Sequence, residues 1–273
     1  MRVFNSLYTF AAVLTFITSS AYGDADLTEA DALFARRSQG SEATKAARTA
    51  YENALPQLSN QNLVYAVSRM AQLDVYAGEI LLPKSAKDQR RAIFERCHDE
   101  LLPKIKPEVV GETAQYFYWS GTCLAFWAEA MNPIERAFKV PALKRALNGG
   151  FAQDTRYYGG GIKRLAAAVW SNPGARPVGL YKPEEALVKI NEALASEAYP
   201  GDSNQGSSYY TNYKYKVTVL KELGRRAEAL AVATTAISEI EELETANSLP
   251  AQLEPETLFE LANLRDLKAS LGE

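Results

Sequence analysis

The sequence predicts an all-α protein, built as a helical-repeat solenoid of about eleven helices. Three observations lead to this prediction. Apolar residues recur at every third or fourth position through most of the chain, which is the period of a helix with one buried face. Convincing period-two alternation of apolar and polar residues, typical of strands, is absent. One spacing of small and apolar residues returns three times, as it does in repeat proteins.

Length and composition fit one soluble domain. The chain has 273 residues, of which 47% are hydrophobic and 23% are charged, an ordinary composition for a soluble globular protein. Its formal net charge of −3 argues against nucleic acid as a partner, because neutralising phosphates requires a basic face. We expect a single helical domain over residues 24–273, preceded by a targeting segment over residues 1–23.

The first 23 residues have the pattern of a signal peptide. Arg2 supplies a positive end, residues 7–17 form a short apolar run, and small residues follow. We expect cleavage after Ala21 or Gly23 and export of the mature protein; the alternative is an uncleaved membrane anchor. No cysteine lies near the cleavage site, so lipid attachment is not expected.

Four helices are expected in the first part of the domain. Thr28 and Asp31 resemble a capping box, and Ser41 is a candidate cap for the second helix. Pro83 and Pro103 are stop signals for the third and fourth helices. The expected ranges are 28–37, 41–55, 62–82 and 85–102.

The next helix, residues 112–131, is apolar on nearly all sides and is expected to be the buried centre of the N-terminal half. Asn132 and Pro133 supply a cap and a first-turn proline for a helix that follows. We expect Pro141 to break or kink that helix and residues 148–150, Asn-Gly-Gly, to end it. The aromatic residues of the 112–131 helix are Tyr116, Phe117, Tyr118, Trp119, Phe126 and Trp127.

The spacing that recurs is that of the second helix of a tetratricopeptide repeat. Its small alanines let neighbouring helices approach closely, while a larger residue between them fills the gap. The expected fold is therefore tetratricopeptide-like. The three copies are Ala47-x3-Tyr51-x2-Ala54, Ala186-x3-Ile190-x2-Ala193 and Ala229-x3-Ala233-x2-Ala236. The remaining helices are expected at 162–170, 183–194, 207–223, 225–244 and 255–270.

Two long loops and a run of glycines interrupt this pattern. Residues 171–182 and 199–207 form loops of a length that is often functional, with a harmless insertion as the alternative. Gly159, Gly160 and Gly161 are each roughly 1 kcal/mol worse than alanine inside a helix. They indicate either close packing of another backbone or an unwound helix entry beneath a ligand or partner.

The two cysteines permit one disulfide. Cys97 and Cys123 are expected on consecutive antiparallel helices at similar distances from the connecting turn, and the alternative is two separate buried thiols. With a lone His98 they fall short of a four-ligand zinc site. We expect His98 at the surface, and no metal or cofactor.

The central stretch resembles a known family. Asp154-x2-Tyr157-Tyr158-Gly159-Gly160-Gly161-x2-Arg164, an apolar helix, a Pro/Gly loop and Glu185-Ala186 are similar to the T component of tripartite ATP-independent periplasmic (TRAP) transporters. The resemblance is clearest over residues 154–237. It implies a non-catalytic periplasmic helical-repeat protein that pairs with a periplasmic solute-binding protein, has room for an apolar or amphipathic ligand, and can form trimers.

Aromatic residues are dense around the two long loops, and the sequence predicts the binding surface there. Tyrosine favours recognition surfaces because it combines apolar area with a hydroxyl group. Arg164 is expected to meet a carboxylate head or an acidic partner residue, or instead to cap a neighbouring helix. Failing this site, the surroundings of Trp119 and Trp127 are the next candidate. The predicted ligand- or partner-binding residues are Tyr157, Tyr158, Gly159, Gly160, Gly161, Arg164, Trp170, Tyr181 and Tyr209.

The alternatives are a cell-wall scaffold or a helical glycan hydrolase. A hydrolase needs a carboxyl group of raised pKa in a cleft, and Glu112 and Glu129, at the ends of the aromatic helix, are the acids to test. The Glu-Ser pair of lytic transglycosylases, nucleophile motifs, metal motifs and phosphate loops do not occur. We therefore expect a protein that is not an enzyme.

Overall fold

The computed structural model describes residues 25–251 and 253–272, and within them all regular structure is helical, with twelve α-helices and no strand. The predicted all-α class is confirmed. The signal peptide predicted for residues 1–23 lies outside the described residues. The α-helices are α1 Thr28–Ala35, α2 Ser41–Ala54, α3 Asn60–Tyr76, α4 Lys87–Arg96, α5 Pro107–Val110, α6 Ala114–Glu129, α7 Pro133–Phe151, α8 Tyr157–Ser171, α9 Pro183–Leu194, α10 Tyr210–Glu222, α11 Arg226–Thr245 and α12 Glu254–Ser270.

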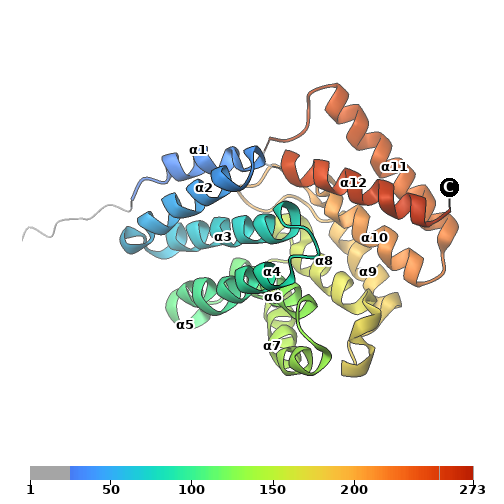
Figure 1. Cartoon of the computed structure of the whole chain (residues 1–273), viewed down its shortest axis with the longest axis horizontal. Coiled ribbons are helices and arrows are strands. Elements are labelled where there is room, and N and C mark those ends of the chain that lie inside the picture. Colours follow the sequence, from blue (N-terminus) through green and yellow to red (C-terminus); the bar gives the residue numbers. More distant parts are fainter. Residues whose placement is uncertain (1–24, 252, 273) are drawn as a thin grey trace, which may run out of the picture.

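The helices are arranged as neighbouring pairs from one side of the molecule to the other (Figure 1). Helices α1–α3 lie on one side and α9–α12 on the other, with α8 between them. Consecutive helices pack on each other, most extensively α8 on α9, α6 on α7 and α10 on α11. No helix among residues 25–251 and 253–272 is both long and apolar enough to cross a bilayer.

The alanines of the recurring spacing are buried between helices. Ala186, Ile190 and Ala193 of α9 are 0% exposed, and so are Ala229, Ala233 and Ala236 of α11. Ala47 and Tyr51 in α2 are equally buried, whereas Ala54 is half-buried. Small residues at these positions allow the backbones to approach, which is the packing that the spacing predicts.

Side-chain caps decide some of the helix starts. Asn132 forms the predicted cap of α7: its Oδ1 accepts hydrogen bonds from the backbone N–H groups of Ile134 and Glu135. The capping box predicted for Thr28 and Asp31 is wrong. The Asp26 carboxylate instead accepts from both the backbone N–H and the hydroxyl of Thr28, the first residue of α1.

Helix α7 corrects a second prediction, because it continues through Pro141 and ends at Phe151. Proline leaves the carbonyl four residues earlier without its helical donor. That carbonyl belongs to Ala137, which is exposed, so water can satisfy it. Gly149 and Gly150 lie inside the helix and not after it, where they make room for the side chains of Phe117 and Ile162.

Two α-helices end in a π-helical turn. α3 continues as η3, Ala77–Leu81, and α4 continues as η4, Cys97–Leu101. π-helical turns inside helices are often found at functional sites. Gly78 in η3 packs against the Phe94 ring, and its carbonyl accepts a 2.9 Å hydrogen bond from Arg90 Nε.

Cys97 and Cys123 form a disulfide that joins η4 to α6, with Cα atoms 6.0 Å apart. The alternative of two separate thiols is therefore wrong. Both residues are 0% exposed. His98, next to Cys97, is half-buried: 19% of its side chain is exposed, and its ring lies beside Trp127 and Asp99.

Candidate functional site

The three glycines lie where the chain enters α8, in a left-handed turn. Tyr158, Gly159 and Gly160 have φ angles of 53°, 60° and 77° with positive ψ. A Cβ atom at Gly160 would lie 2.7 Å from Ala193 Cα in α9, and one at Gly161 would lie 2.7 Å from the Tyr118 ring. The glycines therefore provide the predicted close packing, and the backbone at Gly159 and Gly160 is unwound as well. Tyr158 adopts the same conformation with a side chain, a rare and costly state that its surroundings must stabilise.

Arg164, further along α8, stabilises the left-handed backbone conformation of Tyr158, Gly159 and Gly160. Its Nη2 donates to the Tyr158 carbonyl at 3.1 Å and to the Tyr118 hydroxyl at 2.9 Å, and its Nη1 donates to Asn212 Oδ1 at 2.9 Å. Asn212 Nδ2 in turn donates to the Gly159 carbonyl at 3.0 Å. The predicted cap of a neighbouring helix is therefore wrong, because the backbone carbonyl that Arg164 bonds is that of Tyr158, at the entry of its own helix.

Arg164 has no carboxylate partner. It is 4% exposed, and among the residues that the structure describes no carboxylate oxygen lies within 4.0 Å of its guanidinium. Three tyrosine rings surround it, those of Tyr118, Tyr158 and Tyr209, each between 5.4 and 5.7 Å from the guanidinium carbon. These three acceptors engage three of the five N–H groups of the arginine.

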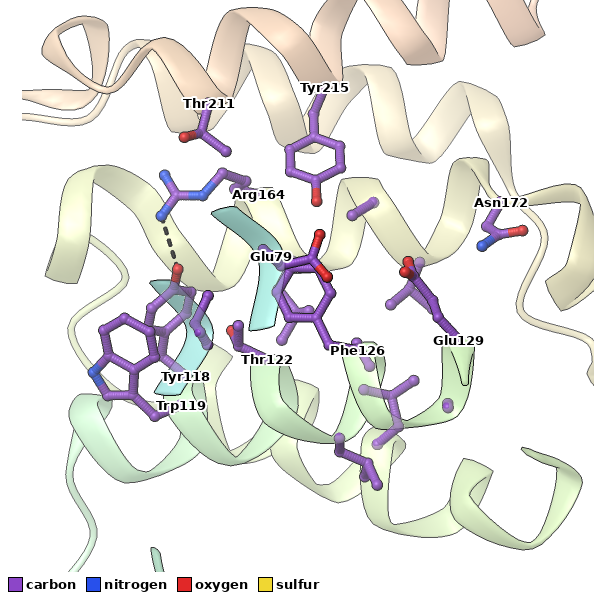
Figure 2. A pocket seen from close by; sticks show the side chains of 18 of the residues that line it. Glu79, Tyr118, Trp119, Thr122, Phe126, Glu129, Arg164, Asn172, Thr211 and Tyr215 are labelled. Carbon is purple, nitrogen blue, oxygen red and sulfur yellow. Dashed lines mark hydrogen bonds between the residues drawn. The ribbon is translucent and has the colours of Figure 1, made fainter. Parts of the chain in front are cut away.

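A cavity of about 200 Å³ opens beside Arg164 (Figure 2). Its walls come from α3 with η3, and from α6, α7, α8, α10 and α12, together with η6, Pro173–Val178, in the first long loop. One wall is apolar and belongs mainly to the core between α6, α7 and α8. The apolar lining includes Leu124, Val140, Leu143, Leu165, Val169 and Leu180.

The two ends of the cavity differ. In Figure 2, Arg164, Tyr118 and Trp119 lie at one end, and Glu129 and Asn172 at the other. Arg164, Tyr118 and Trp119 are buried, whereas Glu129 and Asn172 are exposed. The cavity therefore opens to solvent between the end of α6 and the loop of residues 171–182, and it closes at Arg164. The second long loop, residues 199–207, does not line it.

Two other charged side chains of the cavity, Glu79 and Lys214, are neutralised by ion pairs. Glu79 pairs with Lys84 and Arg90, and Lys214 pairs with Glu260 at 3.2 Å. Burial alone lowers the pKa of Lys214, but the charge of Glu260 and the neighbouring Tyr215 outweigh it and raise the pKa above that of free lysine. Lys214 therefore stays charged and already neutralised, which distinguishes it from Arg164.

Only some of the residues predicted to bind a ligand or partner line the cavity. Tyr158 and Arg164 line the cavity. Gly159, Gly160 and Gly161 pack against neighbouring side chains and backbone and do not reach it. Tyr157 lies directly behind it, where its hydroxyl accepts a 2.9 Å hydrogen bond from Trp119 Nε1.

Three further predicted residues lie away from the cavity. Tyr209 covers Gly159 and donates to Asp202 at 2.7 Å; with Tyr158 it lines a separate cavity of about 30 Å³. Trp170 packs on Phe151. Tyr181 donates to Glu222 at 2.5 Å beneath the Arg176 guanidinium.

The tyrosines around the turn are held neutral. Burial raises the pKa of Tyr158 well above its usual value, with the charge of Glu256 adding to the effect. Burial also raises the pKa of Tyr157 and, together with the neighbouring Tyr158, that of Tyr209. Each hydroxyl therefore remains a donor and acceptor throughout the physiological range.

Several lining residues were not predicted as site residues. Phe126 and Thr122 look like core residues of an aromatic helix, while Lys214, Tyr215 and Glu256 belong to helices far along the chain. Tyr118 and Trp119 belong to the same aromatic helix, and Trp119 was the second-choice candidate. One sequence signal points to them: an arginine inside an otherwise apolar helix has to find polar partners when it is buried.

The two acids considered for catalysis are far apart. Glu112 precedes α6, is exposed, and accepts a hydrogen bond from Gln153 outside the cavity, while Glu129 ends α6 at its mouth. A helix of this length separates them by more than about 20 Å, whereas the carboxyl pair of a glycosidase lies roughly 5–10 Å apart. These two residues cannot flank one glycosidic bond.

Within residues 25–251 and 253–272 no group of three or more His, Cys, Asp or Glu side chains is placed to hold a metal ion. Comparison of the chain with protein-family models and with curated proteins finds no match.

Proposed function

We propose that the chain is a non-catalytic periplasmic binding protein of tetratricopeptide-like architecture, which holds an elongated apolar molecule with a carboxylate head in the cavity between α6, α8 and α10. The head group lies at Arg164, and the apolar part lies along the wall formed by α6, α7 and η6. This class of ligand includes unbranched aliphatic carboxylates.

The observation that supports the proposal most strongly is a buried, unneutralised cation at the closed end of an apolar cavity. A buried charge is normally paired, as Glu79 and Lys214 of this cavity are. Arg164 has neutral acceptors for three of its N–H groups and no carboxylate. A ligand carboxylate would complete this arrangement with a charge-assisted hydrogen bond, the strongest kind available to it.

The lining supports an apolar body for the ligand. Binding pockets for small molecules are mostly apolar, with a few polar groups that fix orientation. The wall contributed by Val140, Leu143 and Leu180 offers no hydrogen-bonding side chains, while Tyr118 and Thr122 lie nearer to Arg164 (Figure 2). The apolar side chains are thus gathered on one wall, whereas polar side chains lie at Arg164, midway at Glu79 and Tyr215, and at the mouth (Figure 2).

The partner is proposed from the family resemblance over residues 154–237. That resemblance favours a TRAP solute-binding protein as partner, association into trimers, and the periplasm as location. Repeat helices present surfaces suited to such partners. A gene for a TRAP solute-binding protein beside the gene for this chain, and a shift in elution volume when the two purified proteins are mixed, would support the assignment; an unchanged elution volume would count against it.

Calorimetric titration tests the ligand class directly. Octanoate, decanoate and dodecanoate are titrated into the protein, with the alcohol of the same chain length as the matched control ligand. We expect the carboxylates to bind about ten- to hundredfold more tightly than the alcohols, since a hydrogen bond to a charged group contributes about 1.5–3 kcal/mol. In Arg164→Gln that preference should disappear.

Arg164 also stabilises the left-handed turn, so a second variant separates binding from folding. Ala168 lies one turn after Arg164 in α8 and lines the cavity, and Ala168→Phe fills the space without removing a hydrogen bond. We expect wild-type helix content and loss of carboxylate binding, while Ala231→Phe on the exposed side of α11 should bind normally. Equal binding of acid and alcohol by the wild-type protein would refute the head-group assignment, and full binding by Ala168→Phe would refute the cavity.

A further inference from the structure

The first half of helix α7 exposes a continuous apolar stripe. Ile134 and Phe138 are 73% and 79% exposed, the two highest values among the large exposed hydrophobic residues of the described chain. Ala137 and Pro141 are exposed as well. Residues at i, i+3, i+4 and i+7 share one face of a helix, so these four side chains form one stripe directed away from the core. We call it the α7 stripe.

The same face becomes basic in the second half of the helix. Lys144 and Arg145 are exposed and follow the stripe at the next helical turn. Neither has an ion-pair partner among the residues that the structure describes. α7 as a whole carries four basic residues and one acidic residue, Glu135, which is paired with Arg91 at 3.2 Å. Four basic residues against one acidic residue give α7 a net charge of +3, the highest of the twelve described α-helices, in a chain of net charge −3.

The opposite face of α7 belongs to the cavity. The residues of α7 that line it are Arg136, Lys139, Val140 and Leu143, and α7 begins four residues after Glu129 at the mouth. One helix therefore forms a wall of the cavity on one side and presents the α7 stripe on the other. Figure 1 shows α7 at the edge of the molecule, next to the segment of η6.

We propose that α7 docks this protein onto the surface of an anionic phospholipid bilayer. The α7 stripe enters the boundary between head groups and acyl chains, and Lys144 and Arg145 bind the lipid phosphates. Apolar residues that protrude singly from a convex helix fit a deformable bilayer, and adjacent basic residues match anionic head groups. The docking does not depend on what the cavity binds.

Vesicle binding of the full chain tests the proposal. Vesicles of phosphatidylethanolamine and phosphatidylglycerol are compared with vesicles of phosphatidylcholine alone. Phe138→Ser should weaken binding to the anionic vesicles by at least about tenfold, since it removes one buried aromatic side chain. Lys144→Gln combined with Arg145→Gln should weaken it by about twenty- to thirtyfold and reduce its salt dependence, since each basic residue near the surface contributes about fivefold. Val188→Ser, which alters another exposed apolar residue on α9, is the matched control and should bind like the wild type.

A local probe assigns any binding to α7 and not to residues 1–24. The native cysteines form a disulfide, so a thiol-reactive, polarity-sensitive dye labels Ala137→Cys alone, and Val188→Cys serves as the control. On anionic vesicles the emission at position 137 should shift to the blue while that at position 188 stays unchanged.

If the emission of the dye at position 137 does not shift to the blue on anionic vesicles, the proposal is overturned. A Phe138→Ser variant that binds them like the wild type would overturn it too. A blue shift at position 137 with a soluble TRAP solute-binding protein, but not with vesicles, would assign the α7 stripe to a protein interface and overturn the lipid docking. Far-ultraviolet circular dichroism verifies that each variant is folded.

Discussion

The two halves of the molecule bring their helices together by different means. In the N-terminal half, large aromatic side chains of α6 fill the space between helices, two helices end in π-helical turns, and the disulfide Cys97–Cys123 joins η4 to α6. In the C-terminal half, alanines at every third or fourth position bring α9, α10 and α11 together without a covalent link. The cavity lies where these two kinds of packing meet.

Loss of the disulfide is the change with the largest expected effect on this comparison. The bond closes a loop between residues 26 positions apart, for which the chain-entropy relation gives about 3–4 kcal/mol of stabilisation. We expect Cys97→Ser with Cys123→Ser to lower the free energy of unfolding by about that amount, measured by urea denaturation.

The disulfide variant also shows whether aromatic packing alone holds α4 and α6 together. A loss well below about 1 kcal/mol would mean that the aromatic core of the N-terminal half holds α4 and α6 together without the covalent link. The wild-type protein with and without a reductant provides the control, because it changes no side chain.

Enlarging a small residue tests the packing on the C-terminal side. Gly160→Leu meets the Ala193 backbone and retains a positive φ angle, and Ala233→Leu meets neighbouring helices at a fully buried position. Each should lower the stability by about 1–3 kcal/mol, seen as a lower melting temperature. Ala231→Leu, on the exposed side of the same α11, should leave it unchanged. Equal melting temperatures for Ala233→Leu and Ala231→Leu would contradict the alanine-mediated packing.

Alkaline pH should weaken the junction between the halves. The folded protein raises the pKa values of Tyr157, Tyr158 and Tyr209 above that of free tyrosine, mainly by burial. The unfolded chain ionises first, so stability is fully present below about pH 10 and falls as the pH rises further. Melting temperatures and tyrosinate absorbance followed together should show that these tyrosines ionise only on unfolding. Their ionisation in the folded protein would contradict the burial.

The sequence predicts helices where local chemistry is decisive. Asn132 caps α7 because its side chain meets donors two and three residues away, and Ala186, Ala229 and Ala233 are buried because their spacing leaves them on one face. Helix α7 can continue through Pro141 because Ala137, whose carbonyl loses its helical donor there, is exposed to water. Only the folded structure reveals that exposure.

The site was predicted less completely than the fold. Arg164 and Tyr158 were found because glycines and an arginine in an apolar helix are anomalous in a local pattern. Tyr118, Lys214 and Glu256 join them from helices far apart in the chain, and single-sequence periodicity carries no information about such distant neighbours. The aromatic residues near the second long loop, in contrast, serve to cover Gly159 and to hold that loop through Asp202.

The measurement that tests the account most directly is a crystal structure with dodecanoate brominated at its terminal carbon, located by anomalous scattering. The account predicts a carboxylate within about 3 Å of the Arg164 guanidinium, as charge-assisted hydrogen bonds require, and a bromine beside Val140, Leu143 and Leu180. A carboxylate placed away from Arg164, or bromine outside the cavity, would contradict it.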